Sequence, residues 1–359
     1  MVGKEGQQID HYRLVRLLKR ESDIETYFAV HVHLPTSVTI KVFLGPFSDA
    51  SREKILAWAH NIMQLNHAHI VYILNCFSID KDIFLIVANK DFNTFHQRYP
   101  YNTHHPFKNT LSYARQIADA LSYAHHQKVM HGDIQPENLL IDMNDDISIT
   151  GFLPPIILQK AFAFEQSGTN SVAYKAPEQF GVNGRILPAS DQYALGVIIY
   201  EWLSGARPFT GSREDIIVKH QLAVPPPLTL SSSGVTFEME QVVMRALAKD
   251  PNQRYPDIKI FVDALYQAVP PNLKQMISMR DSGTLSVSSL STEKRRGRQI
   301  GSSFSIWYVA GLLLLLLLIV SVGFLSPGMF VGPHQPASPT SSTQTIADID
   351  QMTPSDRYN

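Results

Sequence analysis

Short runs of β-branched and aromatic residues alternate with polar residues in the N-terminal quarter of the chain. These runs lie at 11–18, 26–33, 38–44, 71–77 and 83–88. Runs of this length and composition predict β-strands. One stretch with helical spacing, 52–65, interrupts them. The pattern therefore predicts a small β-rich region with a single helix, over residues 11–89.

Beyond residue 89 the apolar positions recur with the period of an α-helix. Leu111, Ala114, Ile117, Leu121 and Ala124 fall on one face of such a helix. The segment 190–203 is apolar nearly all round, which predicts a helix at the centre of a core. A small strand lobe at 11–89 followed by a larger helical lobe at 90–273 predicts an α+β fold with two lobes.

A long apolar segment near the C-terminus predicts one transmembrane helix. Residues 304–325 carry no charge and include an unbroken leucine run at 312–318. About 20 apolar residues suffice to span a bilayer as a helix. A basic cluster between Lys294 and Arg298 precedes the span, and no charge follows it until Asp348. The positive-inside rule therefore predicts a single-pass protein with its folded lobes in the cytoplasm, its tail outside, and the basic cluster against membrane lipid.

The remaining segments predict little packed structure. Residues 1–10 are polar without an apolar core, which favours a loose leader over a cleaved secretory signal. The linker 274–303 is rich in serine and then basic, and the tail 326–359 is too poor in apolar residues to build a core. With Cys76 alone, no intramolecular disulfide can form, as is usual in a reducing cytosol. A net charge of −1 gives no argument for a nucleic-acid partner.

One motif carries candidate chemistry. His131, Gly132 and Asp133, with Asn138 five residues after Asp133, resemble the H-R-D-x-x-x-x-N catalytic loop of protein kinases. Taken alone, the motif is also similar to the HGD of small-molecule kinases such as aminoglycoside phosphotransferases. Further matches are therefore needed to separate the two families.

Three further matches favour the protein kinases. Ala176-Pro177-Glu178 resembles the A-P-E motif, which the small-molecule kinases lack. Asp191 lies in a segment that resembles a central helix of the family, and Arg254 matches the arginine that pairs with the A-P-E glutamate, here Glu178. The resemblance extends over about residues 12–265 and is closest to bacterial membrane-anchored Ser/Thr kinases.

The resemblance implies a site that binds ATP and magnesium. It places Asp133 as proton acceptor, Asn138 as a metal ligand and Lys41 at the ATP phosphates. Other positions implied at the nucleotide are Lys19, Val87, Ala88 and Leu140. The implied structural residues are the pair Glu178 and Arg254, Asp191, and a hydrophobic spine of His131, Phe152, Ile62 and Ile73.

The sequence departs from the family pattern where phosphate and metal would bind. The three glycine positions of the phosphate loop hold Lys19, Glu21 and Ile24. Trp58 stands at the position of the helix glutamate that pairs with the lysine, and Gln135 replaces the usual catalytic-loop lysine. Gly151 replaces the D-F-G aspartate, and a glycine has no side-chain oxygen for a hard cation.

These departures predict a pseudokinase that acts as a cytoplasmic signalling module and binds protein partners, such as an active kinase. Asp133 then has a structural role, for example a hydrogen bond to Ser171. Two alternatives stay open. One is a weak or atypical Ser/Thr protein kinase that uses Asp133, Asn138 and Lys41. The other is a domain that binds ATP without hydrolysing it.

Overall fold

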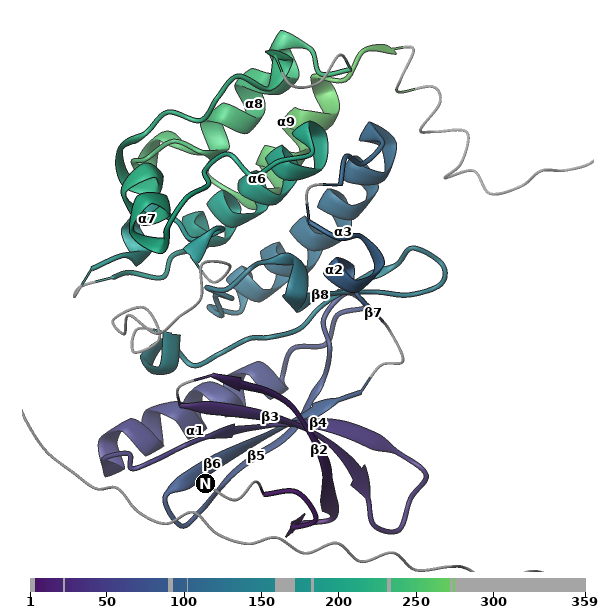
Figure 1. Ribbon diagram of the computed structural model, residues 1–359, viewed down its shortest axis with the longest axis vertical. Coiled ribbons are helices and arrows are strands. Elements are labelled where there is room, and N and C mark those ends of the chain that lie inside the picture. The colour runs from purple at the N-terminus through teal and green to yellow at the C-terminus, as the bar shows by residue number, and fades with distance from the viewer. Residues whose placement is uncertain are drawn as a thin grey trace, which may run out of the picture. The chain divides into compact units, whose positions relative to one another are not determined.

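An antiparallel sheet of six strands forms the small lobe of the computed structural model (Figure 1), in the order β1-β2-β3-β4-β6-β5. The strands are β1 (Gln8–Ile9), β2 (Tyr12–Glu21), β3 (Ile24–His31), β4 (Ser37–Phe43), β5 (Ile73–Ile79) and β6 (Asp82–Ala88), and helix α1 spans Asp49–Met63. All five predicted strands and the predicted helix are present. Their ends differ from the predicted ends by a few residues.

The two faces of this sheet bury different sets of side chains. One face carries Tyr27, Ala29, Ile40 and Val42 into a core of its own, with Leu14 from β2. The other face belongs to a second core, which contains Ile24, Phe43 and Leu85 from the strands and Ile55 and Ala59 from α1. Alternation with period two along each strand produces this division.

Residues 4–10, which we expected to be a loose leader, are ordered against the sheet. Gln8 and Ile9 pair with Arg13 and Tyr12, and Gly6 N donates to the Leu14 carbonyl over 2.8 Å. Lys4 forms an ion pair with Asp82, the first residue of β6. The prediction of a loose leader was wrong for these residues, because it depended only on their polar composition. The edge of β2 offers this segment backbone partners that composition does not reveal.

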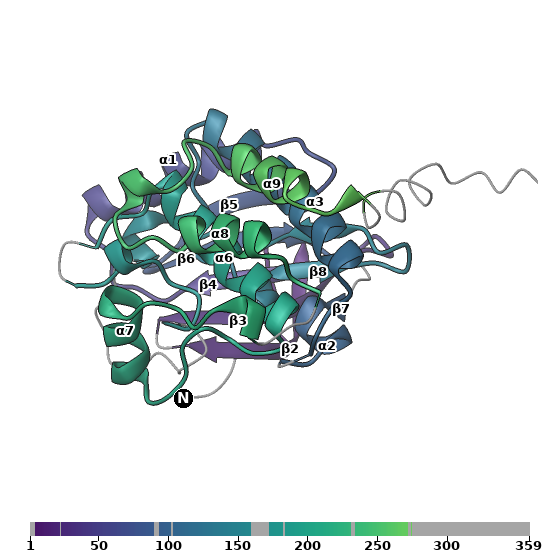
Figure 2. The ribbon, with the colours of Figure 1, turned by 90° about the horizontal axis from the view of Figure 1, so that it is seen from above.

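The large lobe is built from helices around α6, as predicted. Its helices are α2 (Phe95–Arg98), α3 (Phe107–His126), α6 (Pro188–Ser204), α7 (Arg213–Leu222), α8 (Phe237–Ala246) and α9 (Ile258–Gln267), with 3-10 turns η1 (Pro136–Asn138), η2 (Pro177–Gln179), η3 (Leu228–Leu230) and η4 (Pro251–Gln253). Every residue of α6 from Ser190 to Leu203 is buried, and α6 contacts α3, α8 and α9 (Figure 2). Gly205, with φ 76°, ends the helix.

A second sheet connects the large lobe to the small one. It contains β7 (Asn93–Thr94), β8 (Leu139–Ile141) and β9 (Ile147–Ile149). Val71 N donates to the Ile149 carbonyl over 2.9 Å, and Ile149 N donates to the His69 carbonyl over 2.8 Å. These bonds hold the catalytic-loop end of the large lobe beside α1 and the small sheet. The residues that follow β9 therefore enter the small-lobe core.

The structure describes residues 4–21, 23–89, 93–101, 103–158, 172–181, 184–230, 234–271 and 274. Three predicted segments lie outside these residues: the linker after Lys274, the transmembrane helix at 304–325 and the tail. Residue 90, the first of the predicted large lobe, also lies outside them. Among the helices of the described part, none combines the length and the apolar character that a membrane crossing requires.

Candidate functional site

A buried carboxylate on α6 holds the catalytic loop in place. Asp191 accepts hydrogen bonds from the backbone N–H groups of His131 (2.9 Å) and Gly132 (2.7 Å), and from His125 Nε2 (2.8 Å). Burial alone would raise the pKa of Asp191, but the bonds from His125 and the backbone hold it below its usual value. Asp191 is therefore ionised, and its hydrogen bonds to the backbone hold the catalytic loop in place.

His131 and Phe152 are in contact, as the spine prediction requires. Their ring centroids lie 4.4 Å apart. His131 Nδ1 accepts the Asp133 N–H over 3.1 Å, so the proton resides on Nε2, which donates to the Thr150 carbonyl over 2.9 Å. Burial lowers the pKa of His131 and keeps the ring neutral. Phe152 and Ile62 belong to one buried core, that of the large lobe, and Ile73 packs against it.

The Asp133 carboxylate is enclosed by donors from this chain. Its Oδ1 pairs with the ammonium of Lys175, and its Oδ2 accepts from Gln135 Nε2 (2.9 Å) and Asn138 Nδ2 (3.0 Å). Burial by itself raises the pKa of Asp133, but the Lys175 charge and hydrogen bond, with a smaller effect of Lys41, hold it below its usual value. The group is thus an ionised carboxylate with both oxygens occupied.

Lys175 is a site residue that the sequence reasoning missed. It directly precedes the A-P-E segment, it is almost fully buried, and its ammonium also donates to the Gly132 carbonyl over 3.1 Å. The one available signal was a lysine beside A-P-E in a chain whose usual catalytic-loop lysine is Gln135. The hydrogen bond predicted from Ser171 to Asp133 lies outside the described residues.

The Asn138 side chain fills the space beside Gly151. Gly151 has φ +90°, and a Cβ built on it would overlap the Asn138 amide, whose Nδ2 would be only 2.9 Å away. Asn138 Nδ2 also donates to the Asp133 carbonyl over 2.8 Å, and Thr150 N donates to the Asn138 carbonyl over 2.9 Å. Asn138, the predicted metal ligand, is therefore hydrogen-bonded to Asp133. It also packs against Gly151, which replaces the aspartate that would be the other ligand.

Apolar side chains surround this part of the site. Leu153, Ile157 and Leu158 follow Gly151 and belong to the small-lobe core. A Cβ on Gly132 would lie 2.8 Å from Leu158 Cδ1 and 2.9 Å from a methyl of Ile186. In the described part of the chain, no three His, Cys, Asp or Glu side chains lie close enough together to hold a metal ion. The residues at this position do not fit the magnesium site that the resemblance implies, because Gly151 has no carboxylate and the Asn138 amide occupies the space of a side chain there.

The small lobe contributes Lys41 but no glutamate from the predicted position on α1. Lys41 lies on β4, opposite Thr26 on β3 and Leu85 on β6. Trp58 packs against the core between the sheet and α1 and also against the core of the large lobe, whereas Glu53 is exposed. The inward position on α1 is therefore occupied by a neutral ring.

The residues implied at the nucleotide divide into two groups. Val87 is buried in the small-lobe core, and Ala88 and Leu140 pack against that core, so these three come together. Lys19 lies opposite Thr26 in the β2–β3 hairpin, and Thr26 in turn lies opposite Lys41 on β4, so the two lysines belong to one row across the sheet. Asp145 lies in the turn between β8 and β9 and pairs with Arg98 over 2.8 Å.

The predicted pair between Arg254 and the A-P-E glutamate is present. Arg254 donates from both terminal nitrogens to the two oxygens of Glu178, each over 2.8 Å, and its side chain is 0% exposed. It also donates to the carbonyls of Ala189 and Ala248 over 2.8 Å each. The large lobe is therefore closed around this segment by an internal ion pair.

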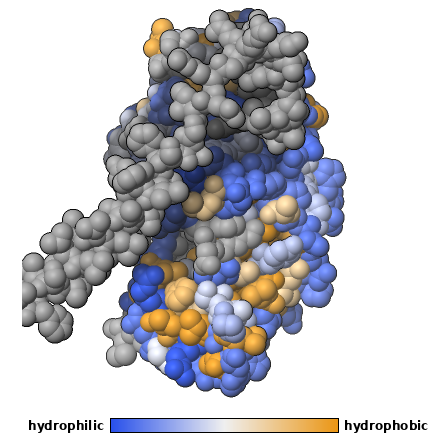
Figure 3. Space-filling view, turned by 90° about the vertical axis from the view of Figure 1, so that its right-hand side faces the viewer, coloured by the Kyte–Doolittle hydropathy of each residue, from blue (hydrophilic) through white to orange (hydrophobic). Residues whose placement is uncertain are grey.

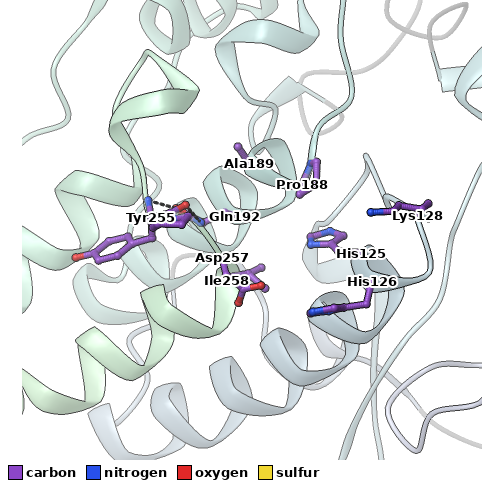
Figure 4. Close-up of a pocket in the computed structure, with 10 residues that line it drawn as sticks. His125, His126, Lys128, Pro188, Ala189, Gln192, Tyr255, Asp257 and Ile258 are labelled. Atoms are coloured by element: carbon purple, nitrogen blue, oxygen red, sulfur yellow. Dashed lines mark hydrogen bonds between the residues drawn. The ribbon is translucent and has the colours of Figure 1, made fainter.

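A cavity of about 240 Å³ lies between the end of α3 and the starts of α6 and α9 (Figure 4), and neither Asp133, Asn138 nor Gly151 lines it. His125, His126 and Lys128 line one side, and Asp257 and Ile258 line the other. It includes no residue that the sequence implied at the nucleotide. His125 connects this cavity to the loop through its bond to Asp191.

Comparison with known proteins agrees with the geometry. Residues 25–265, more than half of the chain, match the family model described as "Protein kinase domain". The chain is 29% identical over 272 residues to the serine/threonine-protein kinase PrkC of Bacillus subtilis, a match that covers 72% of this chain and 42% of PrkC. It is 30% identical over 294 residues to Pkn1 of Myxococcus xanthus, covering 79% of this chain and 42% of Pkn1. The chain thus spans less than half the length of these relatives.

Proposed function

The chain belongs to the protein kinase family, and we propose that within it this protein is a membrane-anchored pseudokinase, a cytoplasmic module that signals by binding other proteins. One observation carries the proposal. At the position of the metal-binding aspartate stands Gly151, and the Asn138 amide fills the space that a side chain there would need. Phosphoryl transfer relies on positioning and on charge stabilisation by metal ions, so this loss affects the main source of the rate.

The state of Asp133 supports the same proposal. A general base must reach the hydroxyl proton it removes, at about 2.6–3.2 Å. Both Asp133 oxygens already accept bonds from Lys175, Gln135 and Asn138. A carboxylate held in this way serves the fold, and a substrate hydroxyl would have to displace one of these donors.

A weak Ser/Thr kinase is the second candidate, favoured by one observation. The charge of Lys41 lies close enough to Asp133 to contribute to the lowered pKa of that carboxyl. The fold thus brings two residues implied in catalysis toward the same place. ATP and magnesium enter the function only under this candidate, or under a variant that binds ATP without turnover.

The proposed partners are cytoplasmic proteins, for which an active kinase is our first candidate. Large apolar side chains that are exposed on the small lobe, among them Val15, Leu34, Tyr72 and Leu74, support a binding role. Figure 3 shows apolar residues gathered over the lower part of one face, where the small lobe lies. The anchoring helix at 304–325 and the basic cluster at 294–298 would keep such a partner at the membrane.

Two measurements on the full-length protein in detergent test the proposal. Radiolabel transfer from ATP to the protein itself or to a generic protein substrate should stay at background, with or without magnesium. A melting temperature that rises with ATP in the absence of magnesium would support the variant that binds without turnover. Transfer that requires magnesium and is lost in Lys41→Met would refute the pseudokinase. Lys41→Met is the better variant here because Asp133 also holds Lys175.

A further inference from the structure

We propose that Lys175 is the internal counter-ion of Asp133 and that this pair holds the segment 172–179 on the catalytic loop, with or without a bound nucleotide. The inference deepens the proposed function and rests on it, because Asp133 is given a structural task. It assigns to Lys175 a positioning role that neither the motifs nor the family match provides.

The burial of the pair is the first argument. The Lys175 side chain is 4% exposed and that of Asp133 is 16% exposed. An ammonium group so far from water requires a compensating charge and hydrogen bonds. Asp133 supplies the charge, and the Gly132 carbonyl, 3.1 Å from Nζ, supplies a further acceptor. The lysine is therefore placed to join two loops and not to reach a ligand in solvent.

The catalytic loop itself carries no positive charge at Gly132, next to Asp133. The H-R-D pattern has an arginine at this position. Here the space beside Gly132 is filled by Leu158 and Ile186, and its φ of +73° favours glycine. A side chain at this position would have to displace Leu158 and Ile186 and adopt a left-handed backbone. Lys175 approaches the same carboxylate from the opposite segment.

A second connection acts in parallel with the ion pair. Gln179 Nε2 donates to the Gly132 carbonyl over 2.8 Å, and its Oε1 accepts the Ala176 N–H over 2.9 Å. Lys175 and Gln179, which lie on either side of the A-P-E motif, thus both donate to the Gly132 carbonyl. The segment is attached to the loop by polar bonds that are all internal to the chain.

The attachment extends to α7. His220 on α7 contacts the Ala173 carbonyl through Nε2 (3.0 Å) and the Tyr193 hydroxyl through Nδ1 (2.9 Å). The exposed side of α7 carries Val218 and Leu222. Holding segment 172–179 in place therefore also supports the surface that α7 presents.

Hydrogen–deuterium exchange on the full-length protein in detergent tests the pair. In Lys175→Met, amides of 172–179 should exchange at least about tenfold faster than in the wild type. Lys259→Met is the matched control, because it breaks the exposed Lys259–Asp119 ion pair in the same lobe. That control should leave the exchange of 172–179 unchanged, and ATP with magnesium should not slow it in the wild type.

The double variant Lys175→Met/Asp133→Asn separates an ion pair from general packing. Removing both charges should return much of the lost protection, since no uncompensated carboxylate remains. Equal exchange in the double and single variants, or unchanged exchange in Lys175→Met, would overturn the inference. Should Lys175→Met fail to accumulate, accumulation of the double variant supports the pair and its failure contradicts it. Phosphate transfer by the wild type would refute the proposed function and leave these exchange results standing.

Discussion

Restoring an aspartate at position 151 tests the central structural argument. In Gly151→Asp the new Cβ would overlap the Asn138 amide, and the residue would have to adopt φ +90°. We therefore expect the substitution to destabilise the protein and not to create a magnesium site. Sequence comparison alone predicts the opposite, because the change restores the aspartate of the D-F-G position, although Leu153 still stands where the motif has its glycine.

The magnitude follows from three contributions. A left-handed backbone conformation costs a residue with a side chain about 1–2 kcal/mol. Moving Asn138 aside breaks its bond to the Asp133 carboxylate, about 1.5–3 kcal/mol, and its bond to the Asp133 carbonyl, about 0.5–1.5 kcal/mol. The expected loss is about 3–6 kcal/mol. At roughly 2–4 °C per kcal/mol, the melting temperature should fall by at least about 6 °C.

Thermal unfolding of the full-length protein in detergent, with and without ATP and magnesium, measures the fall in melting temperature of Gly151→Asp. Gly151→Ala is the control, since it adds the Cβ without the carboxylate and should lose most of the same stability. Adding Asn138→Ala to Gly151→Asp should recover part of the loss by removing the overlap. An unchanged melting temperature in Gly151→Asp, or a rise that depends on magnesium and ATP, would refute the reasoning.

Two further predictions concern the large lobe. Arg254→Met should lower the free energy of unfolding in urea by roughly 3–5 kcal/mol, because Glu178 is left without its buried partner. Adding Glu178→Gln to this variant should recover part of the loss. No recovery would contradict the pairing. Burial lowers the pKa of His220 to about 3, so the unfolded chain, near pKa 6.5, binds the proton first. Stability should therefore fall as the pH drops below about 6.5, by roughly 2 kcal/mol from this residue between pH 7 and pH 5. An equally steep fall in His220→Gln would contradict this assignment.

The elements of the fold were predictable because their signals are local. Alternation along 38–44 and the helical period from Leu111 to Ala124 depend on neighbours within a few residues. The order of residues 4–10 was not predictable in this way. Its pairing with β2 and the ion pair from Lys4 to Asp82 depend on partners that only the folded sheet brings near.

The site divides along the same line. Motif matching located Asp133, Asn138 and Gly151 in the chain, but not how Asn138 packs on the glycine. Lys175 was missed because it is 42 residues from its partner Asp133 in the chain. It also precedes the A-P-E motif, which does not include a lysine. Contacts between distant loops depend on the backbone path, and residue identity at one position does not encode them.

The charges of the site are balanced within the chain, and this bears on what the site can bind. Asp133 pairs with Lys175 and Glu178 with Arg254, each largely out of water, and the buried Asp191 accepts hydrogen bonds from His125 and the loop backbone. A nucleotide triphosphate needs positive charge that the protein does not already use, and magnesium needs free oxygen ligands. In this lobe a ligand that drew Lys175 away would leave Asp133 buried without a counter-ion, which costs several kcal/mol. The same pairs close the large lobe around the A-P-E segment, and in the pseudokinase proposed above their task is to maintain the fold that contacts other proteins.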